Sequence, residues 1–299
     1  MGNTKSLINI GELSKPAVVL IEKISDALGG LFKPWQTVRV ARADAQAEGI
    51  RAAAQIEITD LHRRALTRFV AEQAQRQANM ESITRKALDD LEDEARPEEI
   101  QNDWISNFFD KCRLISDEEM QNLWAKVLAG EANTPGKYSR RTVNLLGSLD
   151  KGDATLFRNL CCFAWNFGDE GEWFPLIYDY KASMYTSMGL TFNGLTHLDA
   201  IGLITYSGVQ TYSNTELAEV VKLSYHGSVV QVDLTRAWRD DFDRDRRAMS
   251  VGHVLLTQMG EELAPISGAT PVSGFADYVL RRLTTGGCVV SSPWPREKQ

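Results

Sequence analysis

Apolar residues between positions 102 and 157 recur three or four residues apart, which is the spacing that places side chains on one face of a helix. Aromatic residues are concentrated on the first of these faces, and a tryptophan lies in the middle of the second. Because such faces are buried by packing against one another, this stretch predicts a compact helical domain. We expect its core to contain Trp104, Phe108, Met120, Leu123, Trp124 and Leu128.

Capping residues predict where these helices begin and end. Ser116 is followed three residues later by Glu119, which is the spacing of a capping box. The helix that begins there is expected to end at Gly130, and Ser139 is expected to cap the next one. Further along, residues 160–165 are expected to complete another helix.

Another apolar face lies near the N-terminus. Residues 14–30 begin with Ser14 and an early proline and end in two glycines, which are the boundaries of one helix. This helix is too short to span a bilayer, which needs about 20 residues. Its apolar face is expected to pack in a bundle or an oligomer interface, with contact to a membrane surface as the alternative. That face consists of Ala17, Leu20, Ile21, Ile24 and Leu28.

Residues 37–91 form a long run of good helix formers without proline, and they predict one long helix. Its apolar stripe is narrow and repeats after eleven residues, a period that favours a weak right-handed supercoil. Such a stripe needs a second helix, from the same chain or from another copy. We expect a coiled-coil interface in a homo-oligomer, formed by Ile50, Ala54, Ile58, Leu61, Ala65 and Phe69.

Beyond residue 157 the pattern changes to one that resembles a winged helix. A helix is expected over residues 190–204, followed by a two-stranded hairpin around His226 and Gly227. A strand over residues 253–257 and a helix over 260–266 follow. From position 150 onward, 18 acidic residues oppose 13 basic ones, whereas DNA-reading modules carry a basic face. A winged helix that contacts protein is therefore favoured over one that binds nucleic acid.

The whole pattern predicts a mainly α protein with an α+β C-terminal part. Long N-terminal helices are expected in residues 1–97, a central helical domain in 98–166 and a winged-helix-like domain in 167–299. The length of 299 residues and the apolar fraction of 43% suffice for more than one core. Four cysteines without CxxC spacing fit reduced thiols in a cytoplasmic protein.

Few residues suggest chemistry. The aspartates in residues 240–245 are interrupted by arginines and lack the turning glycine of a calcium loop, so a solvated loop is expected. Glu131 is expected to close a helix corner by hydrogen bonds, with a catalytic role as the alternative. Phosphate-binding, nucleophile-elbow and kinase motifs are absent from the sequence. We therefore expect no cofactor, no metal and no enzymatic activity of a common class.

Residues 104–136 read W-I-x-x-F-F-x-K-x-x-x-I-S-D-E-E-M-Q-x-L-W-A-K-x-L-A-G-E-A-x-x-P-G. This run looks like the hallmark of an uncharacterised bacterial family, and it is similar in looser form to a segment of the Abi-alpha abortive-infection proteins. The resemblance implies a role in antiviral defence. Together with the residue pattern, it predicts a self-assembling, non-enzymatic protein. Its N-terminal helices would act in assembly or on the inner membrane, and its C-terminal domain would dock a phage or host protein. The alternative is a winged-helix regulator or nucleic-acid-binding adaptor.

Overall fold

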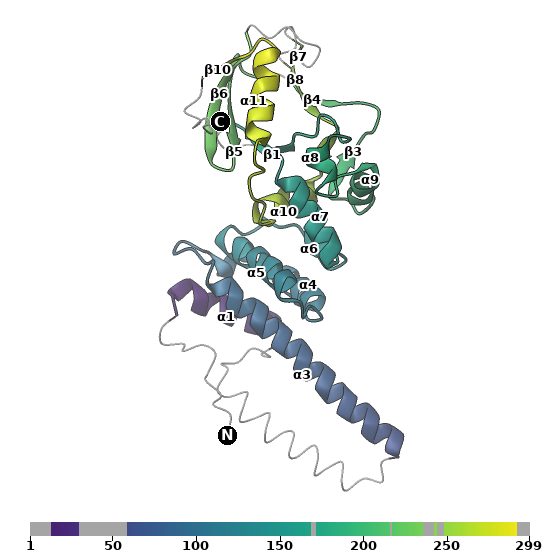
Figure 1. Ribbon diagram of the computed structural model, residues 1–299. Helices are drawn as coiled ribbons and strands as arrows, with labels where there is room; N and C mark the ends of the chain where they lie inside the picture. The colour runs from purple at the N-terminus through teal and green to yellow at the C-terminus, as the bar shows by residue number, and fades with distance from the viewer. Residues whose placement is uncertain are drawn as a thin grey trace. The chain divides into compact units, whose positions relative to one another are not determined.

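The computed structural model describes residues 13–29, 59–168, 172–215, 217–235, 242–243 and 248–291 (Figure 1). The protein is mainly α with an α+β C-terminal half, as the sequence predicts. Two compact units divide the chain, Met1–Gly147 and Ser148–Gln299. Residues 148–166 belong to the second unit, whereas the sequence pattern grouped them with the central helices.

The described part of the first unit is helical. Helix α3 packs with its C-terminal half against α5, α1 packs against α4 and the 3-10 turn η2, and α6 packs against α4. Their bounds are α1 Lys15–Ala27, α3 Asp60–Leu88, η2 Pro97–Glu99, α4 Asn102–Cys112, α5 Glu118–Asn133 and α6 Arg140–Leu146.

Aromatic rings from α4 and α5 form the centre of this unit. Phe108 stacks on Trp104 at 5.1 Å between ring centroids and meets Trp124 edge to face at 5.0 Å. Of the predicted core residues, Leu123 is half-buried. The others are buried, namely Trp104, Phe108, Met120, Trp124 and Leu128.

Helix α1 begins as predicted and ends earlier. The Ser14 hydroxyl accepts a hydrogen bond from the Ala17 amide at 3.4 Å. Gly29 already has a φ of 69°, the left-handed conformation that closes a helix. The predicted end at Gly30 is therefore wrong, because the helix itself stops at Ala27.

The boundaries of α5 also differ from the prediction. Asp117, and not Ser116, caps the helix, because its carboxylate accepts from the Met120 amide at 3.1 Å. The helix continues through Gly130 to Asn133. A side chain at Gly130 would lie 2.7 Å from Cε2 of Tyr138, so this glycine allows a close approach and does not end the helix.

The long helix predicted over residues 37–91 does not run through Thr59. Thr59 has a non-helical backbone, with φ of −56° and ψ of 151°, and its hydroxyl accepts from the His62 amide, so α3 begins at Asp60. A helix cannot run through a residue in that conformation. The prediction of one continuous helix is therefore wrong, and its part before residue 59 lies outside the described residues.

The second unit combines short helices with antiparallel strands. The helices are α7 Lys151–Cys161, α8 Ser183–Thr186, α9 Phe192–Ala200, α10 Gln258–Leu263 with the 3-10 turn η3 Ala264–Ile266, and α11 Phe275–Thr285. The strands are β1 Ala164–Phe167, β2 Glu172–Pro175, β3 Ile204–Tyr206, β4 Tyr212–Asn214, β5 Val220–Tyr225, β6 Ser228–Asp233, β7 Phe242–Asp243, β8 Ala248–Gly252, β9 Val254–Leu256 and β10 Val289–Ser291.

The largest sheet has the strand order β10-β6-β5-β1-β2. A second sheet pairs β3 with β9, and a third has the strand order β4-β8-β7. The predicted hairpin is confirmed as β5 and β6, joined by His226 and Gly227 with φ of 45° and 84°. Positive φ at both positions is what a tight two-residue hairpin requires. Helix α11 covers one face of the sheet, with Phe275 5.6 Å from the ring of Tyr225 (Figure 1).

Two predicted helices of this unit end sooner than expected. The helix over residues 190–204 stops at Ala200, because Gly202 turns the chain with a φ of 86° and Ile204 pairs with Leu256. The helix expected to include residues 160–165 stops at Cys161. Trp165 lies in β1, where alternating aromatic residues favour a strand.

Candidate assembly surface

The first half of α3 exposes large apolar side chains. Leu61 is 65% exposed, Phe69 57%, Leu66 45% and Val70 38%. Every residue from 59 to 72 is exposed, and α3 extends well past the ends of α4 and α5 (Figure 1). Contiguous exposed apolar side chains mark interaction sites more often than scattered ones do. We call the set Leu61, Ala65, Leu66 and Phe69 the apolar face of α3; Val70 follows Leu61 by nine residues and therefore lies on the opposite side of the helix from it.

This apolar face is the upstream continuation of the face that packs against α5. Leu66 is followed at intervals of seven residues by Gln73, Met80 and Ala87, and Phe69 by Arg76 and Ile83. Residues seven apart lie on the same side of a helix. Met80, Ile83 and Ala87 are buried. One stripe therefore runs along α3, covered in its second half and open in its first.

Polar contacts show where the covered half begins. The Asn79 side-chain amide donates to the Arg113 carbonyl oxygen at 2.9 Å. Three residues later, the Ser82 hydroxyl donates to Gln121 Oε1 at 2.8 Å, and the amide of Gln121 donates to the Ile115 carbonyl oxygen at 2.9 Å. These bonds fix α5 and the loop before it onto α3 from residue 79 onward.

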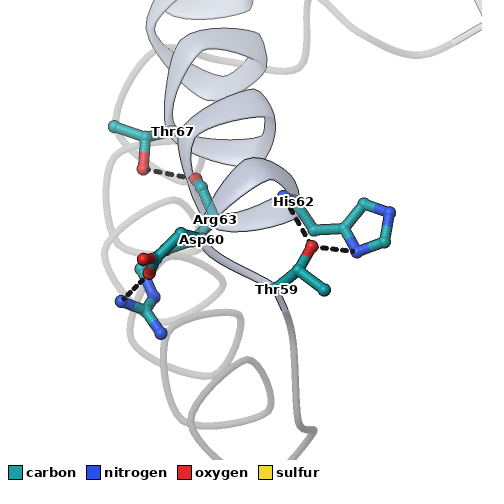
Figure 2. A network of polar contacts seen from close by, with 5 residues as sticks. All are labelled: Thr59, Asp60, His62, Arg63 and Thr67. Atoms are coloured by element: carbon teal, nitrogen blue, oxygen red, sulfur yellow. Dashed lines mark hydrogen bonds and ion pairs between the residues drawn. The ribbon is translucent and has the colours of Figure 1, made fainter.

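The first turn of α3 is held by bonds within the helix itself (Figure 2). Thr59 Oγ1 lies 3.1 Å from His62 Nδ1, and Arg63 pairs with Asp60 at 3.1 Å. The Thr67 hydroxyl donates to the Arg63 carbonyl oxygen at 3.0 Å. Exposed pairs of this kind contribute only about 0.2–1 kcal/mol each. They define the start of the helix, while burial of its apolar face needs a partner.

The structure places the predicted interface residues unevenly. Leu61 and Phe69 are among the most exposed large apolar side chains of the described chain, and Ala65 is exposed beside them. Ile50, Ala54 and Ile58 lie outside the described residues. Leu66 was missed, because the eleven-residue recurrence follows a single row. The seven-residue spacing from Leu66 to Met80 was the signal that would have found Leu66.

The apolar face of α1 is buried within the first unit, where α1 packs against α4 and η2. Ala17, Leu20, Ile21 and Ile24 are buried, and Leu28 is half-buried. The Ser106 hydroxyl of α4 donates to the Ala27 carbonyl oxygen at 3.4 Å. Among the described residues, no helix has the length and apolar character to cross a membrane.

Glu131 closes the corner after α5, as the favoured alternative predicts. Its side chain is 3% exposed and accepts hydrogen bonds from the amides of Gly136 at 2.7 Å and Tyr138 at 2.9 Å. The Trp104 indole donates to the Tyr138 carbonyl oxygen at 2.7 Å. The Glu131 carboxylate is therefore bound to backbone amides of the loop after α5, and its role is structural.

Other reactive groups are few in the part of the chain that the structure describes. No three His, Cys, Asp or Glu residues there are grouped to hold a metal ion. The four cysteines are buried, and burial raises the pKa of Cys161 to about 12 and of Cys288 to about 11. Thiols with such pKa values remain protonated and unreactive at neutral pH.

One histidine and one carboxylate join α7 to α9. His197 Nε2 lies 2.6 Å from Asp153 Oδ1, and Asp153 also completes a capping box with Asp150 at the start of α7. Burial alone would raise the pKa of Asp153, but the hydrogen bond and charge of His197 and the Asp150 amide together lower it. The pair thus links two helices by a hydrogen bond, which is also an ion pair when His197 is protonated.

A family model described as a protein of unknown function, DUF2806, matches residues 63–280. The match includes most of α3 and continues into α11. It agrees with the predicted uncharacterised family, and it shows no similarity to the Abi-alpha proteins. No curated protein and no solved structure matches the chain.

Proposed function

The chain belongs to the DUF2806 family of unknown function, and from that premise we propose a non-enzymatic protein that self-assembles through the apolar face of α3. A single observation carries the proposal. The stripe that α5 buries in the second half of α3 continues uncovered over the first half, where Leu61 and Phe69 are more than half exposed. A second copy offers the same face and can cover it by symmetry.

The free energy available from this face is of the size that association needs. Fully burying a leucine, valine or phenylalanine contributes about 1.5–3 kcal/mol. The three large side chains of the face are already about half covered, so a two-fold interface that buries them in both copies recovers on the order of 4–9 kcal/mol. Association costs about 4–15 kcal/mol. A reversible oligomer is the expected result.

Replacing both Leu61 and Phe69 with aspartate tests the proposal. In the oligomer, each aspartate would be buried between the two α3 helices without a positive charge to pair with. Since burying an unpaired charge is costly, the copies should separate. The matched control places aspartate at Ala71 and Ala78, which are exposed on the opposite side of the same helix. Light scattering gives the mass, and circular dichroism checks that the helices remain.

The expected result is an oligomeric wild type and control together with a monomeric L61D/F69D variant. A wild type that is monomeric at micromolar concentration would overturn the proposal. So would a double variant with the mass of the wild type.

The cellular role that we propose is antiviral defence of the abortive-infection kind, in the bacterial cytoplasm. Its support is the looser resemblance to the Abi-alpha proteins that the sequence shows from about Trp104 to Phe157, to which the family match adds nothing. Assembly would be the step that activates the protein. Phage plating on cells that produce wild type, L61D/F69D or the Ala71 and Ala78 control tests this role. Protection by wild type and control alone is expected, and equal plating on all three strains would contradict it.

The alternative of a nucleic-acid adaptor has less support. The β5–β6 hairpin, which would form the wing, lies between β10 and β1 within the five-stranded sheet. Its strand edges are therefore paired with neighbouring strands. Retention on DNA that falls steeply with salt would favour this alternative, because counterion release accompanies phosphate binding.

A further inference from the structure

We propose that two copies associate antiparallel through residues 60–76 of α3, around a two-fold axis near residue 68. This inference rests on the proposed self-assembly and names the partner and its orientation. The partner is a second copy of this chain.

Helix α5 excludes a parallel, in-register pair. From Asn79 onward, the face of α3 that continues the apolar face is covered by α5 of the same chain. Two parallel helices that met through this face would place both copies of α5 between them. In an antiparallel pair only the free halves overlap, and α5 of each copy lies beyond the end of the other helix.

The free half also has a self-complementary register. It runs from Leu61 to Arg76, about 24 Å at 1.5 Å per residue. An antiparallel overlay centred between residues 67 and 68 sets Leu66 of one copy against Phe69 of the other, and the same contact occurs twice. The same overlay sets His62 against Gln73, so apolar residues meet apolar ones and polar residues meet polar ones.

Charges along the free half favour the same orientation. In a parallel pair, each charged residue lies level with its own copy, so like charges are neighbours. The antiparallel overlay brings Glu72 level with Arg63 of the other copy, and Asp60 level with Gln75, one residue before Arg76. Both acidic residues of the segment then lie near arginines, and the two helix dipoles oppose each other.

Cross-linking between single-cysteine variants tests the orientation. The four native cysteines are buried, so a cysteine introduced at His62 or Gln73 is the accessible one. Neither substitution removes a residue of the apolar face. Each variant is treated alone and as an equal mixture with a short thiol-reactive cross-linker, and linked peptides are identified by mass spectrometry.

The antiparallel pair predicts at least a tenfold higher yield for the H62C and Q73C mixture than for either variant alone, with residue 62 linked to residue 73. Oligomers in which each variant links to itself as readily would overturn the orientation and leave self-assembly standing. Oligomers without links, although both thiols react with a monofunctional label, would also overturn it. A monomeric wild type would instead refute the assembly proposal itself.

Discussion

Trp124 shows at the residue scale how the first unit is held together. Its side chain is fully buried and meets Phe108 edge to face. Among the described residues, its indole nitrogen has no hydrogen-bond acceptor. The ring therefore stabilises the unit through packing and not through a polar contact.

Substitution of Trp124 by alanine should lower the free energy of unfolding by about 3–5 kcal/mol, because a large cavity remains. Phenylalanine at this position keeps an aromatic ring against Phe108 and removes the unpaired N–H, so it should cost clearly less. Urea unfolding followed by circular dichroism measures both. An alanine variant within about 0.5 kcal/mol of the wild type would contradict the packing role.

The His197 and Asp153 pair predicts a dependence on pH. Since the pKa of Asp153 is lowered by folding, its contribution to stability is present above the ordinary value of 3.8 and is lost as the pH falls through the folded value. A double-mutant cycle with D153N and H197Q should show coupling at about pH 5 and little at about pH 3. Equal coupling at both pH values would disprove the ionic link.

At the scale of single elements, the start of α5 can be used to test which of two neighbouring residues caps the helix. The Asp117 carboxylate accepts the Met120 amide, whereas Ser116 precedes the cap. Asp117→Ala should therefore cost about 1 kcal/mol in the free energy of unfolding, and Ser116→Ala only a few tenths. Denaturant titration of the two variants decides between them, and the reverse order would restore the capping box that the sequence predicts.

Elements with purely local signals could be predicted from the sequence. The hairpin at His226 and Gly227 follows from two alternating strands around a turn that both residues can adopt. Ser139 caps α6 as expected, with its hydroxyl accepting from the Thr142 amide. In each case neighbouring residues contain all the information that the element needs.

Elements that depend on contacts with residues distant in the sequence could not be predicted from the sequence. Gly130 looks like a helix end in the sequence, and only the ring of Tyr138 against it explains its place inside α5. The same limit applies to the candidate surface. Leu61 and Phe69 follow from periodicity, but the place where α5 stops covering α3 is visible only in the folded unit.

At the scale of the whole molecule, α3 connects fold and assembly. Its stripe contributes Met80, Ile83 and Ala87 to the core of the first unit and offers Leu61, Leu66 and Phe69 to a partner. Gln73 and Arg76 lie between these two apolar stretches. Substitutions before Gln73 are therefore expected to change association, and substitutions after Arg76 to change stability.

The strand order of the large sheet bears on how the protein folds during synthesis. Strand β10, at one edge, pairs with β6, and α11, which covers the sheet, immediately precedes β10. Both follow β6 in the chain, so the apolar side of β5 and β6 stays uncovered until residues 275–291 have left the ribosome. Chaperones that shield nascent apolar strands are expected to act on this unit. The helices up to residue 147 pack against one another, so their packing partners have all been synthesised much earlier.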